Sequence, residues 1–209
     1  ERLGGAVDRV LVVQQVDVCG DPTSDYVGAI LGPDGTSNDL LAVMWNGTDW
    51  LSGEPAEELA TENVASKNAA CKWTKSGGLA LFTYVEGGAL AIRYFAYNKT
   101  LGPGQWGNWT CPENGQIVTS LENAEGSSGP CTTGNIMSDD IEVIHLVRDP
   151  NSDNIMILSM DLAEDLNMTI FNGTHIKPGA SGILEGTTPT ITGAVEPADF
   201  DYYRLVTVI

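Results

Sequence analysis

The stretch Trp45-Asn46-Gly47-Thr48-Asp49-Trp50 returns later in the chain as Phe171-Asn172-Gly173-Thr174-His175-Ile176, at an offset of 171 − 45 = 126 residues. An Asn-Gly pair between apolar residues is a strong local signal for a β-hairpin, because both central residues of the tight turn must take positive φ. The stretch therefore predicts a β-hairpin in two places and a chain built from repeats.

A second repeated stretch supports this prediction. Asp21-Pro22-Thr23-Ser24-Asp25 matches Asp149-Pro150-Asn151-Ser152-Asp153 at an offset of 149 − 21 = 128 residues. The apolar residues 79–83, moved by 126, fall on the apolar residues 205–209. The repeat unit is thus a pair of unlike meanders, and we expect the chain to hold three meanders and the first strand of a fourth.

The remaining chain alternates short β-branched or aromatic runs with turns rich in Gly, Pro, Asn and Asp, which is typical of antiparallel strands. We expect an all-β fold of antiparallel meanders, each of three to four strands, in one repetitive unit over residues 1–209. A connector with at most one or two helical turns is expected over residues 54–69, and a long loop over 111–140. We place residues 105–109 of the second meander where the first has its hairpin. The expected meanders span 9–50, 70–110 and 141–177, with a partial fourth over 198–209.

Meanders closed by an Asn-Gly turn before an aromatic or apolar residue resemble the degenerate bladed β-propeller-like repeats of secreted or surface-displayed microbial proteins. The resemblance rests on Asp21–Trp50 and Asp149–Gly173. It implies propeller-like blades and a display, adhesion or binding role without catalysis. Closed propellers have about four to eight blades, so three and a fragment would leave open edges. An open β-sandwich is the structural alternative.

The charge balance argues against a nucleic-acid partner. The chain has 28 acidic and 10 basic residues and a net charge of −18, which repels phosphate backbones. No stretch reaches the roughly 18 apolar residues of a membrane span.

The cysteines Cys19, Cys71, Cys111 and Cys131 have long spacings without a C-x-x-C pair, which favours disulfides over a zinc site. Cys111 and Cys131 bracket a segment rich in Gly and Ser and are the first pairing, leaving Cys19 with Cys71; three connectivities remain open. The chain also has five Asn-x-Thr glycan acceptor sequences. Together with the disulfides they predict an extracellular or cell-surface location. The acceptors are Asn46, Asn98, Asn108, Asn167 and Asn172.

No catalytic motif is present, so we expect a protein that is not an enzyme. The two histidines, His145 and His175, lie in different meanders without the spacing of a metal site. We expect no cofactor; calcium at the Asp-rich turns is the alternative, since carboxylates suit this cation, but ordinary turns require the same residues. The calcium candidates are Asp21, Asp25, Asp149 and Asp153.

Two functional hypotheses follow. The first is an extracellular structural or adhesive glycoprotein, which binds copies of itself or other surface proteins and forms a surface filament by strand exchange. Its assembly strands would contain Val10, Val12, Leu205, Val206 and Val208. The second is a lectin-like, carbohydrate-binding propeller module, with Trp106, Trp109 and Arg93 as a platform on which sugars stack.

Overall fold

The computed structural model describes the parts of the chain that carry the three expected meanders. These are residues 15–32, 40–51, 56–57, 68–85, 90–101, 108–118, 131–133, 136, 139–161, 166–176 and 182–183. The partial fourth meander at 198–209 and the proposed assembly residues Val10, Val12, Leu205, Val206 and Val208 lie outside this part.

The first sheet is an antiparallel meander in the order β1-β2-β3-β4. Its strands form because apolar and β-branched runs alternate with the turns at Asp21 and, beyond β3, at Asn46. The pairing is regular, with Val18 opposite Ala29 and Ala29 opposite Val43. The strands are β1 (Gln15–Gly20), β2 (Val27–Gly32), β3 (Leu40–Trp45) and β4 (Ala56–Glu57).

The second sheet has the order β5-β6-β7-β8, and a fifth strand, β9, also pairs with β7. The short strands β8 and β9 pair with different parts of β7: Thr110 lies opposite Ala96 and Cys131 opposite Tyr94. A 3₁₀ turn, η1 (Lys99–Leu101), follows β7. The strands are β5 (Ala69–Trp73), β6 (Leu79–Tyr84), β7 (Arg93–Asn98), β8 (Trp109–Thr110) and β9 (Cys131–Thr132).

The third sheet repeats the plan of the first in the order β10-β11-β12-β13, with a register irregularity between Ile141 and Val143. The turn between β10 and β11 contains Asp149, and the repeated Asn172-Gly173 turn follows β12. The strands are β10 (Ile141–Arg148), β11 (Ile155–Asp161), β12 (Leu166–Phe171) and β13 (Gly182–Ile183).

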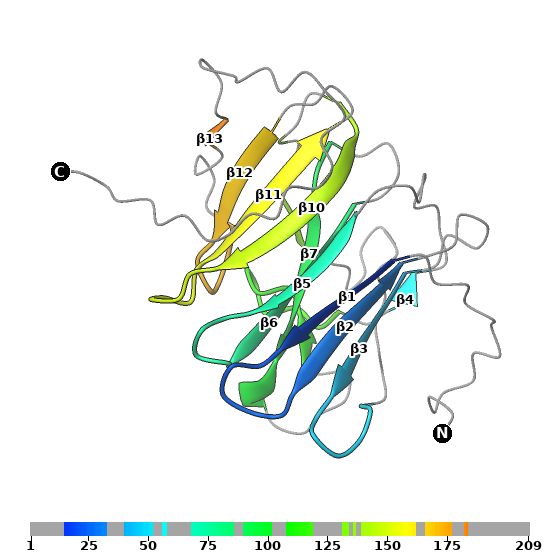
Figure 1. Ribbon diagram of the computed structural model, residues 1–209, viewed down its shortest axis with the longest axis vertical. Coiled ribbons are helices and arrows are strands. Elements are labelled where there is room, and N and C mark those ends of the chain that lie inside the picture. The colour runs from blue at the N-terminus through cyan, green and yellow to red at the C-terminus, as the bar shows by residue number, and fades with distance from the viewer. Residues whose placement is uncertain are drawn as a thin grey trace.

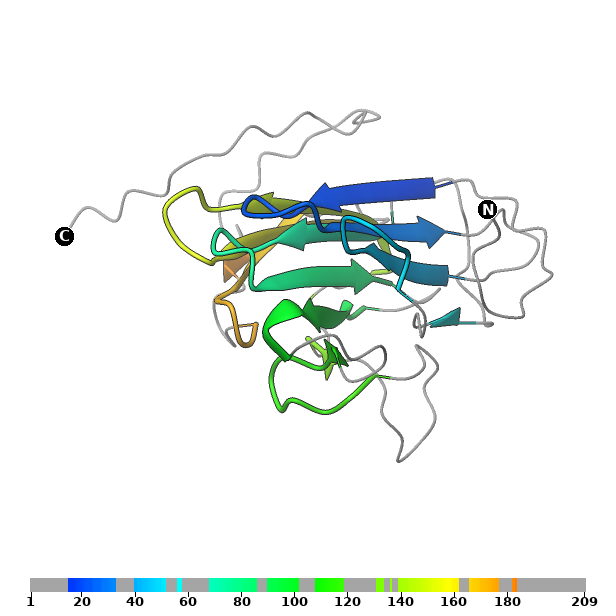
Figure 2. The ribbon, with the colours of Figure 1, turned by 90° about the horizontal axis from the view of Figure 1, so that it is seen from below.

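The three sheets meet along their first strands. β5 lies between β1 and β10 and contacts both (Figure 1). From this line the second sheet, teal to green in Figure 2, extends away from the level of β1 and β10. In the part of the chain that the structure describes, the sheets do not close into a barrel or propeller. Three sheets that spread from a common line also differ from the two facing layers of a β-sandwich.

The core fills the two spaces between the sheets, and aromatic residues dominate it. Phe82 and Phe95 are stacked with centroids 5.4 Å apart, and Trp109 packs edge-on against Phe82 at 5.3 Å. One connected cluster of buried side chains runs from Met44 in the first sheet to Phe171 in the third. The described meanders therefore share one core.

The fold class predicted from the sequence is confirmed: the fold is all-β, with antiparallel meanders. Two local predictions are wrong. Ala56–Glu57, expected in a connector, pairs with Leu40–Leu41 as β4, and Cys131–Thr132, expected in a loop, pairs with β7 as β9. Both strands have only two residues, too few for an alternating pattern to show in the sequence.

Candidate functional site

The junction between the first and second sheets is covalent. Cys19 of β1 and Cys71 of β5 form a disulfide, as the sequence predicted. The Asp17 side chain accepts a hydrogen bond of 2.9 Å from the Cys71 N–H, and the Gln15 amide donates one of 2.9 Å to the Ala69 carbonyl. Because these side chains satisfy backbone groups of β5 that no neighbouring strand pairs, the two sheets are held in one register.

Gly28 in β2 allows the two sheets to approach closely. A Cβ atom at this position would lie 2.8 Å from Phe82 Cζ in the second sheet and 3.2 Å from Cys19 Sγ. Glycine is therefore required here by space rather than by an unusual backbone conformation.

The junction between the second and third sheets is apolar. Ile144 and Ile157 of the third sheet are fully buried, as are Ala70 and Leu81 of the second. A polar contact joins the two sheets at the turns, where the Ser76 N–H donates to the Asp153 carboxylate over 2.7 Å.

The second disulfide, Cys111–Cys131, is also confirmed. Cys111 directly follows β8 and Cys131 begins β9, so this bond joins two short strands that lie against the same strand, β7. Near it, burial and the charge of Glu113, which accepts a hydrogen bond from the Tyr94 hydroxyl, raise the pKa of Tyr94 far above its ordinary value.

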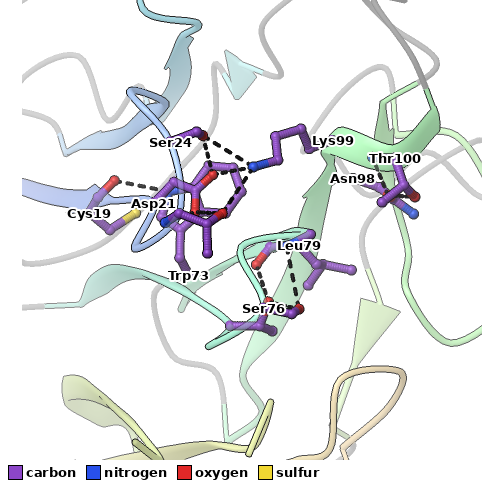
Figure 3. Close-up of polar contacts among 12 residues, drawn as sticks. Cys19, Asp21, Ser24, Trp73, Ser76, Leu79, Asn98, Lys99 and Thr100 are labelled. Atoms are coloured by element: carbon purple, nitrogen blue, oxygen red, sulfur yellow. Dashed lines mark hydrogen bonds and ion pairs between the residues drawn. The ribbon is translucent and has the colours of Figure 1, made fainter.

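An ion pair links the first and second sheets at their turns (Figure 3). The Lys99 ammonium group donates to the Asp21 carboxylate and lies 5.5 Å from the centre of the Tyr26 ring. Burial raises the pKa of Asp21, but hydrogen bonds from Lys99, Ser24 and Thr23 outweigh it and hold this pKa below its ordinary value. The cation is thus neutralised by an internal partner, which makes this cluster a structural contact rather than a site for an anionic ligand.

Three of the predicted glycan acceptors occupy the same structural position. Asn46, Asn98 and Asn172 each stand at the end of the third strand of their meander, at the end of the sheets that carries the β1–β2 and β10–β11 turns (Figure 1). In each, the Asn Oδ1 accepts the N–H and the hydroxyl of the Thr two residues later. The Asn-to-Thr hydroxyl distances are 2.9 Å at Asn46, 2.6 Å at Asn98 and 3.0 Å at Asn172.

Residues 98–100 are therefore the second meander's copy of the Asn-x-Thr turn at residues 46–48. Trp109, which the sequence placed at the position of Trp50, pairs with Tyr97 as Trp50 pairs with Trp45. The offset of 98 − 46 = 52 residues agrees with the neighbouring turn, where Asp21 and Thr74 are 53 apart. Lys99 replaces the glycine of Asn-Gly, which hides the repeat. The shared signal that could have revealed it is Asn-x-Thr itself.

The other two acceptors are buried. Asn108 is 1% exposed and its Nδ2 donates to the Asn98 carbonyl at 3.1 Å; Asn167 is 2% exposed and its Nδ2 donates to the Ile136 carbonyl at 3.0 Å. Nδ2 is the atom that would carry a glycan, and here it points into the protein. Asn46, Asn98 and Asn172 are the candidate glycan acceptors whose side chains stand at turns.

The structure does not assemble the predicted sugar platform. Trp109 is 1% exposed and packs between Phe82, Phe95 and Tyr97, so no sugar can stack on it. Arg93 is partly exposed on β7, and Trp106 lies outside the described residues. The exposed aromatic residue that the prediction passed over is Trp50, which is 46% exposed and contacts Trp45 edge-on at 5.5 Å.

The polar candidates for metal binding do not come together in the described residues. No group of three His, Cys, Asp or Glu side chains that could hold a metal ion is found there. The carboxylates of Asp21 and Asp149 each accept the N–H of the residue two positions later, at 2.8 Å, so both serve their turns. His145 lies on β10, and the His175 ring contacts the Thr174 hydroxyl at 3.0 Å. Among the helices described, none is long and apolar enough to cross a bilayer.

The first sheet has an apolar outer face, defined as the side opposite the second sheet. The strand register places only uncharged residues there. Val16 is 53% exposed and Val18 60% exposed, which is unusual for β-branched residues in a strand, whereas Ala29 and Val43 on the neighbouring strands are 7% and 4% exposed. With Gly20 at its edge, the face consists of Val16, Val18, Val27, Ala29, Leu31, Leu41, Val43 and Trp45.

The third sheet has a similar outer face on the opposite side of the molecule. Its strand register places a single ionisable residue, His145, among apolar ones. Most of these residues are partly exposed; Val147 and Leu158 are 8% exposed. The face consists of Val143, His145, Val147, Met156, Leu158, Met160, Leu166, Met168 and Ile170.

Comparisons with protein families, with curated proteins and with solved structures gave no match to this chain.

Proposed function

We propose that this protein is a structural or adhesive glycoprotein of the cell exterior that does not catalyse a reaction. The observation that supports the proposal most strongly is the position of Asn46, Asn98 and Asn172. The same exposed Asn-x-Thr turn ends the third strand of all three meanders. Glycans on these residues would line one end of the sheets and leave their outer faces bare.

The disulfides support the same location. Both join strands that are distant in sequence, with separations of 52 and 20 residues, and such bonds persist in oxidising compartments. A rigid, covalently joined stack of sheets with glycans at one end suits a structural role. The proposed partners are copies of this chain or other surface proteins.

Glycopeptide mapping of the protein from its native source tests the proposal. Enzymatic removal of N-glycans in heavy-oxygen water labels each occupied Asn. We expect label at Asn46, Asn98 and Asn172 and none at Asn108 and Asn167. Absence of label from all three turn residues would overturn the proposal of a glycoprotein.

A matched variant separates the glycan from the turn. Asn46→Asp keeps the oxygen that accepts the hydrogen bonds of Thr48 but removes the atom that carries a sugar. If the sequence serves only the turn, the mass of the secreted variant will equal that of the wild type apart from the substitution. We expect instead the loss of one glycan.

Carbohydrate binding remains the second candidate, and it rests on Trp50. An exposed indole braced edge-on by Trp45 is a geometry on which a sugar ring can stack. A glycan array probed with the wild type and with Trp50→Ala tests it. Specific signals that the substitution removes would support this candidate, and a blank array would contradict it.

A further inference from the structure

The two junctions between sheets follow one rule. Residues can be aligned through the turn after the first strand, because Asp21, Thr74 and Asp149 each donate their N–H to the carbonyl of the residue five positions later, at 2.9 Å. In this alignment Cys19 corresponds to Lys72 and Val147, which all stand two residues before the turn. Val18 corresponds to Cys71 and Leu146, three residues before it.

Each sheet uses alternate residues of its first strand for its two sides. At the first junction Cys19, two residues before the turn, faces Cys71, three residues before the next turn. At the second junction the buried Leu146 is again three residues before its turn and faces the second sheet. Each sheet therefore contacts the following sheet through the side that holds the residue two positions before its turn. The following sheet takes part in this contact through the side that holds the residue three positions before its own turn.

By this rule the outer face of the first sheet is complementary to the outer face of the third sheet. The outer face of the first sheet contains Val18, which corresponds to Cys71, a residue covered by the preceding sheet. The outer face of the third sheet contains Val147, which corresponds to Cys19, a residue that covers the following sheet. The two open faces thus have the relation that is already satisfied twice inside the molecule.

The composition of these faces also indicates a partner. An antiparallel sheet with one side in water alternates apolar and polar residues, whereas these sheets are apolar on both sides, as in sheets that are covered twice. The chain carries a net charge of −18, yet the outer face of the first sheet has no charged residue. An apolar face that includes exposed valines on so acidic a protein is a contact surface.

We propose that the outer face of the first sheet binds the outer face of the third sheet of a second copy of this chain, with Val18 against His145. His145 is partly exposed and corresponds to Asp17, which contacts Cys71 at the first junction. Such a head-to-tail contact is heterologous, so it leads to a closed ring or to an open filament. The inference rests on the proposed structural role, and it gives that role a partner and a surface. It differs from strand exchange because each copy keeps its own strands.

Cysteine cross-linking between two single variants tests the register of the contact. The native cysteines are all in disulfides, so a new cysteine is the free thiol of its variant. Unglycosylated Val18→Cys and His145→Cys proteins are mixed with oxidised glutathione, and heterodimers are counted by mass spectrometry. The control replaces Val18→Cys by Leu101→Cys, which is 56% exposed but lies on neither face.

We expect the Val18–His145 pair to cross-link at least about tenfold faster than the control pair, because association raises the effective concentration of the two thiols. Equal rates would overturn the proposal, and so would a preference for Val18–Val18 dimers, which would show a symmetric contact. The cross-linking experiment is done on both unglycosylated and glycosylated protein, so that failure of this inference can be distinguished from failure of the proposed function. Glycans without cross-links would leave the glycoprotein intact and contradict the contact; cross-links without glycans would do the reverse.

Discussion

The two faces of the first sheet come from alternate residues of the same three strands, but their surroundings differ. The inner face packs against the second sheet, and its residues Ile30 and Met44 are 1% exposed or less. The outer face, with Val16 and Val18, is more than half exposed at these residues. Both faces are apolar. The contrast is sharpest on β1, where Cys19 on the inner face is 5% exposed and Val18 beside it is 60% exposed, whereas Ala29 and Val43 of the outer face are 7% and 4% exposed. Composition alone therefore does not decide which side of a strand is buried.

The largest expected effect on stability comes from removing the Cys19–Cys71 disulfide, which joins the inner face to the second sheet. Replacing Cys19 and Cys71 by Ala should lower the free energy of unfolding by about 4 kcal/mol, because the bond closes a long loop in the unfolded chain. Denaturant unfolding measures the change. Cys111→Ala with Cys131→Ala is the matched control, with about 3 kcal/mol expected for its shorter loop. An unchanged midpoint in the Cys19 and Cys71 variant would show that the sheets do not need this bond.

A smaller effect is expected from filling the close approach at Gly28. Gly28→Ala places a methyl group 2.8 Å from Phe82 Cζ, and overpacking of this kind costs about 1–3 kcal/mol. Gly20→Ala is the control, since no atom lies within 4 Å of its added Cβ. Thermal unfolding of both variants measures the difference. Equal stability of the two would mean that the sheets are not packed as closely as described.

The ion pair at the turns should contribute less and should depend on pH. Lys99→Met keeps the stem of the side chain but leaves the buried Asp21 carboxylate without its cation, at a cost of about 2 kcal/mol near neutral pH. The pKa of Asp21 is lowered in the folded protein, so this contribution is present above its ordinary value of 3.8 and is lost as the pH falls below it.

Denaturant unfolding at several pH values measures this dependence. The curves of wild type and Lys99→Met should converge at acid pH, where the carboxyl group is protonated. Lys75→Met, on an exposed turn residue, is the control and should follow the wild type throughout. A constant difference at all pH values would show that Lys99 acts through packing and not through its charge.

The smallest effect on the monomer is expected on the outer face. Val18→Thr should change the free energy of unfolding by less than about 0.5 kcal/mol in dilute solution, because the side chain is 60% exposed. Ile30→Thr, on the inner face of the neighbouring strand, should cost about 2 kcal/mol, since it buries an extra hydroxyl group. Equal losses would show that the outer face is covered within the monomer.

Much of the fold follows from the sequence. Turn signals on both sides of residues 40–45 and 166–171 predict β3 and β12 with the observed bounds. Cysteine spacing suggested the observed pairing, although it left the alternatives open. The two-residue strands could not be predicted, because they carry no pattern and form only where a longer strand offers unpaired backbone groups.

The candidate site was less accessible to prediction. The five Asn-x-Thr sequences look alike, and only the fold shows that Asn108 and Asn167 are buried. A tryptophan suits a buried core as well as a sugar-binding surface, so the sequence could not show that Trp109 is buried. The open faces were hidden for a similar reason: in strands that are apolar on both sides, no residue marks the side that faces outward.

Sedimentation equilibrium of the unglycosylated chain over a range of concentrations shows whether the outer faces of the first and third sheets bind each other. The monomer has a mass of 22.2 kDa. We expect the average mass to rise with concentration for the wild type and for Ile117→Asp, which changes an exposed residue outside both faces. For Val18→Asp we expect the average mass to stay at the monomer value. A wild type that remains monomeric at every concentration would contradict the account.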